Sequence, residues 1–261
     1  MPKRISGTLE WAVANKNCLQ GCSHGCRYCY TRAMALRFNR TTREDWEHPV
    51  LNEDEANKRP TKKKGTIMFP TTHDILPEFL EPEIEVIRRL LAVGNNVLIV
   101  SKPHLECIQA ICKEFTEYKD NILFRFTIGC FDDDILGYWE PRAPHFLERF
   151  ASLKHAFQDG YQTSVSCEPM LDSDNMCEMF EMLEPLVTDG IWIGKMNKIR
   201  TRVPCETEED ALRITRIEEG QTDDKIRNIY KRLKNEPKVR WKESIKEVMG
   251  IPAATVAGTD R

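Results

Sequence analysis

The chain has 261 residues, of which 41% are hydrophobic and 30% charged, and its formal net charge is −3. This length suits one large domain or two small ones with a full apolar core. The charge balance excludes a general nucleic-acid coat protein, so any nucleic-acid binding has to come from a local basic patch. The sequence starts without the apolar stretch of a signal peptide and has no run of about 18 apolar residues, which predicts a cytoplasmic protein without a membrane span.

The N-terminal third contains a short predicted strand, a cysteine-rich loop and a polar connection. The sequence T-L-E-W-A-V-A predicts a strand over 8–14, and Met34 and Phe38 have the i,i+4 spacing of a helix over 30–38. Residues 39–65 are mostly polar, which predicts a connection or insertion that adds little to the core.

A regular alternation of strands and helices follows. Pro82 and Gly94 stand near the two ends of one amphipathic stretch, where each residue is favoured. Leu105, Ile108, Cys112 and Phe115 share one face of another. The predicted strands are 66–71, 96–101, 122–128, 161–167 and 191–196, and the predicted helices between and after them are 82–94, 104–118, 146–157 and 175–187.

Six predicted strands alternating with helices form the βαβ pattern of a parallel sheet. Six units are too few for the eight-unit closed barrel, so the predicted fold is α/β, a partial (β/α)6 TIM-like barrel over 1–200. Residues 201–250 predict a helical C-terminal extension, and 251–261 a loose tail. Ligands of such sheets bind at the carboxyl ends of the strands, where the cysteine loop follows the first strand.

Four of the ten cysteines lie between residues 18 and 29, and three of them have the spacing C-x3-C-x2-C. In a reducing compartment, clustered thiols indicate metal binding more than disulfides. Cys18, Cys22, Cys26 and Cys29 supply enough ligands for a structural zinc. Alternatively, Cys22, Cys26 and Cys29 hold an iron–sulfur cluster and leave one iron open for a ligand.

The cysteine motif, with Tyr28 before its last cysteine, resembles that of the radical S-adenosylmethionine superfamily. Four further stretches, F-P-T-T-H-D-I, V-L-I-V-S-K, W-E-P-R-A-P-H-F-L-E-R-F and V-S-C-E-P-M-L, follow in order. Together they resemble the spore photoproduct lyase-like, "DNA repair photolyase-like" branch over about residues 8–200. The resemblance implies a [4Fe–4S] cluster on Cys22, Cys26 and Cys29 whose open iron chelates S-adenosylmethionine. It further implies reductive cleavage to a 5′-deoxyadenosyl radical, hydrogen abstraction from a substrate, and an electron donor of flavodoxin or ferredoxin type.

Polar residues at the predicted strand ends are the candidates for contact with S-adenosylmethionine. Asp74 has the charge to attract the ammonium group, and Arg142 or Lys102 the charge to bind the carboxylate. Ser166 and Glu168 offer acceptors for the ribose, and Tyr28 is expected beside the adenine. Isolated polar residues at strand ends are also ordinary turn formers. The complete set of candidates is Tyr28, Thr72, Asp74, Ser101, Lys102, Thr127, Arg142, Ser166, Glu168 and Lys195.

The substrate and its hydrogen donor are less well specified. Photoproduct lyases use a cysteine near the second strand as hydrogen donor, whereas this chain has no cysteine between residues 30 and 106. Cys130 and Cys167, just past two strand ends, are the alternative catalytic candidates, although ordinary burial explains both.

Three basic stretches, 58–64, 195–202 and 225–242, raise the question of nucleic-acid binding. The last has Tyr230 and Trp241 between its cations, as phosphate contacts and base stacking would require, although mixed charge runs are more often solvated helix faces. A nucleobase, nucleotide or nucleic acid is therefore the leading substrate class. A peptide or small metabolite, and a non-catalytic zinc-binding interaction protein, are the alternatives.

Overall fold

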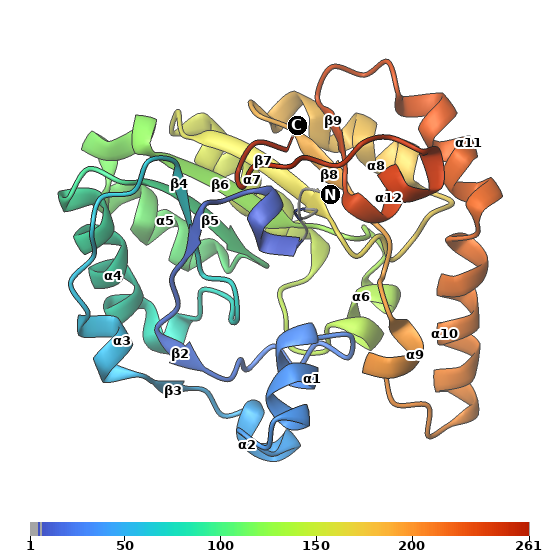
Figure 1. Ribbon diagram of the computed structural model, residues 1–261, viewed down its shortest axis with the longest axis horizontal. Coiled ribbons are helices and arrows are strands. Elements are labelled where there is room, and N and C mark those ends of the chain that lie inside the picture. The colour runs from blue at the N-terminus through green and yellow to red at the C-terminus, as the bar shows by residue number, and fades with distance from the viewer. Residues whose placement is uncertain (1–4, 6, 261) are drawn as a thin grey trace.

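The fold is built on a seven-stranded parallel sheet, seen in a computed structural model that describes residue 5 and residues 7–260 (Figure 1). The strand order is β1-β4-β5-β6-β7-β8-β9, and every neighbouring pair is parallel. The strands are β1 (Ala14–Asn15), β4 (Thr66–Phe69), β5 (Asn96–Ser101), β6 (Ile122–Thr127), β7 (Gln162–Cys167), β8 (Ile191–Ile193) and β9 (Val239–Trp241).

The strand order explains where the helices lie. Each crossover moves one strand further along the sheet, and right-handed crossovers of that kind put their helices on the same face. These helices are amphipathic: Ile84, Ile87 and Leu91 of α4, for example, are buried. The principal crossover helices are α4 (Leu80–Ala92), α5 (Leu105–Glu114), α7 (Phe146–Gln158) and α8 (Met176–Leu183).

The remaining elements lie around the ends of this sheet. Figure 1 shows α1 and α2 together at the bottom of the molecule, with α9 and α10 beside them at the right. These other elements are η1 (Gly7–Glu10), β2 (Leu19–Gln20), α1 (Tyr30–Arg37), α2 (Arg43–Trp46), β3 (Val50–Leu51), α3 (Glu53–Asn57), η2 (Pro77–Phe79), η3 (Thr116–Asn121), α6 (Asp133–Trp139), η4 (Glu184–Leu186), α9 (Ile199–Arg202), α10 (Glu208–Gly220), α11 (Asp223–Leu233) and α12 (Glu243–Met249).

The predicted α/β class and open partial barrel are confirmed, since β1 and β9 do not pair with each other among the described residues. Two expectations about the elements were wrong. The first strand is β1 rather than 8–14, because Gly7–Glu10 forms a 3-10 helix. The C-terminal region is not helical alone, because β9 adds a seventh parallel strand beside β8.

Two segments contact more of the fold than their composition suggests. Within 39–65, Trp46 and Ala56 are buried, and β3 pairs with β2 in an antiparallel ladder. Residues 251–260 contain no helix or strand, yet Gly258 donates a backbone hydrogen bond of 2.8 Å to Leu9. Over the described residues, no helix combines the length and the apolar character that crossing a membrane requires.

Candidate cofactor and substrate cavity

A cavity of about 660 Å³ opens at the carboxyl ends of the parallel strands. All parallel strands end on the same side of the sheet, so the loops that follow them meet at this edge. These loops contribute polar side chains to the wall of the cavity. The lining includes Thr72 and Asp74 after β4, Lys102 after β5, Thr127 of β6, Ser166 and Glu168 at the end of β7, and Lys195 after β8.

The three motif cysteines line this same cavity. Cys22 and Cys26 are buried, and the sulfur of Cys29 caps α1 by accepting a 3.4 Å hydrogen bond from the Arg32 amide. Burial raises the pKa of the Cys26 thiol to about 12. Burial also raises the pKa of Cys22, and because metals bind thiolates, loading such a site releases protons from these two thiols.

Two glycines allow the loop to follow this path. Gly21 has φ +95°, and a Cβ there would lie 2.6 Å from the carbonyl oxygen of Trp46. Gly25 has φ +63°, and a Cβ there would lie 2.6 Å from the guanidinium of Arg142. Glycine adopts positive φ without the steric cost other residues meet, so both turns depend on it.

The spacing of the thiols distinguishes the two metal alternatives. A tetrahedral zinc with Zn–S bonds of about 2.3 Å holds its sulfur ligands about 3.8 Å apart. Among the described residues, no three of Cys18, Cys22, Cys26 and Cys29 have their sulfurs within 4.8 Å of one another. An iron–sulfur cluster binds each cysteine to a different iron and accommodates a wider spacing. A zinc ion held by these thiols alone is therefore disfavoured, whereas a cluster allows their spacing; Cys22 also lies within 4.8 Å of ligand atoms of His24 and Asp74.

Cys18 is separated from the other three. It does not line the cavity, and its sulfur lies 4.0 Å from Nε2 of His73. The same Nε2 accepts backbone hydrogen bonds from Cys18 and Leu19, at 3.2 and 3.3 Å. His73 therefore holds the start of the cysteine loop, and Glu83 lies behind it with a carboxylate oxygen 3.3 Å from His73 Nδ1.

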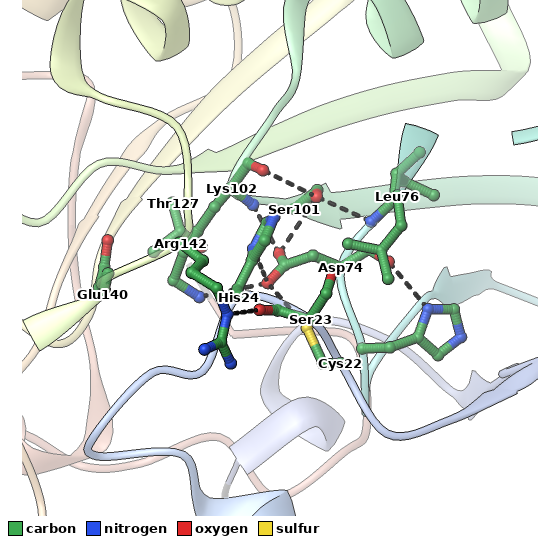
Figure 2. A network of polar contacts seen from close by, with 12 residues as sticks. Cys22, Ser23, His24, Asp74, Leu76, Ser101, Lys102, Thr127, Glu140 and Arg142 are labelled. Carbon is green, nitrogen blue, oxygen red and sulfur yellow. Dashed lines mark hydrogen bonds and ion pairs between the residues drawn. The ribbon is translucent and has the colours of Figure 1, made fainter. Parts of the chain in front are cut away.

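The carboxylate of Asp74 connects the cysteine loop to the ends of β4 and β5 (Figure 2). Its Oδ1 accepts hydrogen bonds from the Lys102 amide at 2.6 Å and the Ser101 hydroxyl at 3.1 Å. Its Oδ2 lies 2.9 Å from His24 Nδ1 and 3.5 Å from Lys102 Nζ. His24 in turn lies 2.9 Å from His104, Nε2 to Nε2.

The electrostatics of this network favour the charged forms of both partners. Burial raises the pKa of Asp74, but Lys102 and His24 lower it by a larger amount. The pKa of Asp74 therefore lies well below its usual value. Burial lowers the pKa of Lys102, yet Asp74, Cys26 and Tyr28 raise it well above its usual value. An ammonium group is thus fixed beside the motif cysteines.

Tyr28 lines the cavity, and its hydroxyl donates a short hydrogen bond to the buried Glu140. The other oxygen of Glu140 lies 2.5 Å from the guanidinium of Arg149, which is itself fully buried. The Tyr28 ring is therefore held by its hydroxyl, with Lys102 Nζ 5.9 Å from the ring centroid.

Eight of the ten predicted cofactor residues line the cavity and two do not. Ser101 is buried behind Asp74. Arg142 is half exposed, pairs with Glu47 at 2.7 Å and donates to the Ser23 carbonyl at 2.6 Å. The expectation that Arg142 reaches the cofactor does not match this placement. The eight lining residues are Tyr28, Thr72, Asp74, Lys102, Thr127, Ser166, Glu168 and Lys195.

The two predicted catalytic thiols lie away from the cavity. Cys130 and Cys167 are 1% and 0% exposed, and neither lines the wall. Cys130 accepts a 3.1 Å hydrogen bond from the Asp132 amide, and Cys167 belongs to β7. Contrary to the expectation that they face the pocket, both pack within the protein interior.

Several lining residues were missed from the sequence. Trp11 and Lys242 lie together, with Lys242 Nζ 4.0 Å from the Trp11 ring centroid. The same ammonium lies 2.9 Å from Glu10 and 3.3 Å from Glu168. Lys242 was not predicted because β9, the strand that it follows, was expected to be helical. A lysine directly after a strand is the sequence signal that could have identified Lys242.

No protein-family model matches the chain. Among curated proteins, it is similar to an uncharacterized protein, ORF301, of Acidianus two-tailed virus. The two are 28% identical over 197 residues, or 70% of this chain, and the match spans 64% of the relative, less than two thirds.

Solved structures give broader matches. A spore photoproduct lyase mutant with bound AdoMet and dinucleoside spore photoproduct has a TM-score of 0.58 and 14% identity, covering 92% of this chain and 78% of that one. SuiB of Streptococcus suis, bound to S-adenosylmethionine, has a TM-score of 0.52 and 11% identity, covering 89% of this chain and 50% of that one. The chain therefore has the partial-barrel fold of spore photoproduct lyase and SuiB, as the sequence resemblance leads one to expect.

Proposed function

We propose that this protein is a radical S-adenosylmethionine enzyme with a [4Fe–4S] cluster on Cys22, Cys26 and Cys29. One observation carries the proposal: the three motif thiols and the polar side chains from five successive strand ends line a single cavity. A cluster with only three protein ligands leaves one iron open, as a catalytic metal requires. When bound, the cluster and S-adenosylmethionine supply a 5′-deoxyadenosyl radical that removes hydrogen from the substrate.

The chain's own residues hold the cofactor in this proposal. Lys102 presents an ammonium beside Cys26 and would bind the methionine carboxylate as a point charge. Ser166 and Glu168 would accept hydrogen bonds from the ribose hydroxyls, with Thr72 and Thr127 on the neighbouring wall. Tyr28, held through its hydroxyl, would contact the adenine.

The role first expected for Asp74 changes. Both of its oxygens already have partners in the chain, and its charge is balanced by Lys102. We therefore propose that Asp74 positions Lys102 and His24 and does not itself bind the methionine ammonium. In the same proposal, the electron comes from a flavodoxin- or ferredoxin-type donor.

A nucleobase, nucleotide or nucleic acid is the proposed substrate class. In its support, a protein of the same fold binds a dinucleoside compound together with AdoMet. The aromatic pair in the basic stretch 225–242 gives no support, because Tyr230 and Trp241 pack on each other with centroids 5.0 Å apart. Substrate recognition is therefore assigned to the cavity, where Trp11 and Tyr30 are both in the wall.

The test is anaerobic reconstitution with iron and sulfide, then reduction with dithionite in the presence of S-adenosylmethionine. We expect 5′-deoxyadenosine from the wild type and none from Cys26→Ala. Cys205→Ala is the matched control, because Cys205 is exposed and outside the cavity, and it should behave as wild type. A fully loaded wild-type cluster that never yields 5′-deoxyadenosine, with or without oligonucleotides, would contradict the proposal.

A further inference from the structure

Two cations in the wall of the cavity have no carboxylate partner. Lys195 follows β8, and Arg202 ends the short helix α9. Both line the cavity, and neither forms an ion pair with any residue in the described part of the chain. Unpaired cations are common on open surfaces but less so in a cavity, where water screens them less.

A second arginine of the same helix shows the contrast. Arg200 forms two hydrogen bonds to the Glu218 carboxylate, at 2.8 and 2.5 Å, and its side chain is 60% exposed. It does not line the cavity. Helix α9 thus presents one arginine to a carboxylate of α10 and the other to the cavity.

The two carboxylates in the cavity wall, Asp74 and Glu168, already have partners. Asp74 pairs with Lys102, and Lys242 lies between Glu10 and Glu168. These contacts leave the charges of Lys195 and Arg202 for a ligand.

The surroundings of Arg202 include one aromatic side chain, that of Tyr30. Its guanidinium carbon lies 5.9 Å from the ring centroid of Tyr30, which also lines the cavity. Tyr30 offers a flat apolar surface, Arg202 a planar guanidinium and Lys195 a separate ammonium. Together these groups fit a ligand that joins an aromatic ring to a phosphate.

We propose that Lys195 and Arg202 bind a phosphate group of a nucleotide-type substrate. The proposal rests on the proposed function and assigns Lys195 to the substrate in place of the cofactor. Arginine supplies a bidentate fork and lysine a point charge, and a phosphate has enough oxygens for both. A carboxylate on the substrate would use the same two cations, so the test separates the two anions.

The test measures binding to the reconstituted protein with S-adenosylmethionine present. The probe is a short fluorescein-labelled oligothymidylate, followed by fluorescence anisotropy, and the competitors are thymidine 5′-monophosphate, thymidine and succinate. The variants are Lys195→Met and Arg202→Gln, and the matched control is Arg200→Gln. Formation of 5′-deoxyadenosine is followed in parallel samples of each variant without oligonucleotide.

We expect each cavity variant to bind the probe about tenfold or more weakly than the wild type, as loss of a charge-assisted hydrogen bond does. Arg200→Gln should bind as wild type, and the monophosphate should compete better than thymidine or succinate. Equal competition by succinate would overturn phosphate in favour of a carboxylate. The proposal would also be overturned if Arg200→Gln lost as much probe affinity as the cavity variants, or if the wild type did not bind the probe. Loss of S-adenosylmethionine binding in Arg202→Gln would overturn it as well. Failure of the proposed function is distinct, because then the wild type forms no 5′-deoxyadenosine.

Discussion

Asp74 is the residue whose charge most directly connects the cysteine loop to the sheet. It is 9% exposed and contacts Lys102, Ser101 and His24. The sequence predicted that Asp74 follows the second strand, 66–71, and in the structure it follows the corresponding strand β4. What it contacts could not be predicted, because His24 and Lys102 reach it from distant parts of the chain.

Replacement of Asp74 by Asn should destabilise the apo protein by about 3–5 kcal/mol at neutral pH, since it leaves the Lys102 ammonium buried without its partner. The folded pKa of Asp74 is lowered, so its contribution is present above the unfolded pKa of about 3.9 and is lost as pH falls through the folded value. Urea unfolding under reducing conditions from pH 7 to pH 3 measures this. Glu85→Gln, which removes an exposed partner of Arg89, is the control and should cost at most about 1 kcal/mol. A wild-type-like Asp74→Asn at pH 7 would contradict the assignment.

The cysteine loop is the element whose shape depends most on particular backbone angles. Its spacing left a four-thiol zinc site and a three-thiol cluster as alternatives, and the structure brings Cys22, Cys26 and Cys29, but not Cys18, to one cavity. The glycines that permit this were not singled out from sequence, because a positive φ is visible only in the folded backbone. The same limit applies to β9, a strand of three residues in a charged region.

Gly21→Ala should destabilise the loop more than Gly25→Ala. Both positions have positive φ, which costs a residue with a Cβ about 1–2 kcal/mol. At Gly21 the new methyl would meet a backbone carbonyl, whereas at Gly25 it would meet the flexible end of Arg142. Gly160→Ala is the control, because φ is +80° there and nothing lies within 4 Å.

Iron content after reconstitution and the thermal midpoint of unfolding check this order. We expect Gly21→Ala to lose iron, while Gly160→Ala keeps it with a slightly lower midpoint. Equal iron content and midpoints in Gly21→Ala and Gly160→Ala would show that the Trp46 carbonyl does not constrain the loop.

At the scale of the whole molecule, the first and last segments of the described residues meet beside the cavity. Lys242, after β9, pairs with Glu10 near the N-terminus and Glu168 after β7. The alternation of strands and helices predicted the sheet from β4 to β8 because each unit is local in sequence. Contacts between distant segments leave no such periodic signal, so the C-terminal contribution to the cavity was missed.

Lys242→Met should lower the free energy of unfolding by about 3–5 kcal/mol at pH 7, since two carboxylates then lose their shared cation. Burial already raises the pKa of Glu10, and removal of Lys242 takes away the attraction that opposes it. The defect should therefore shrink as pH falls and Glu10 becomes protonated. Lys225→Met, which removes an exposed partner of Asp174, is the control for urea unfolding at pH 7 and pH 5. A defect that grows at low pH would contradict this account.

In the proposed function Cys22, Cys26 and Cys29 hold an iron–sulfur cluster and Cys18 does not. Metal and acid-labile sulfide content after anaerobic reconstitution tests it most directly, in the wild type and in four single cysteine-to-alanine variants. We expect about four irons per chain in the wild type and in Cys18→Ala, and a marked loss of iron in the other three variants. One zinc per chain without iron, or a loss in Cys18→Ala equal to that in Cys26→Ala, would contradict it.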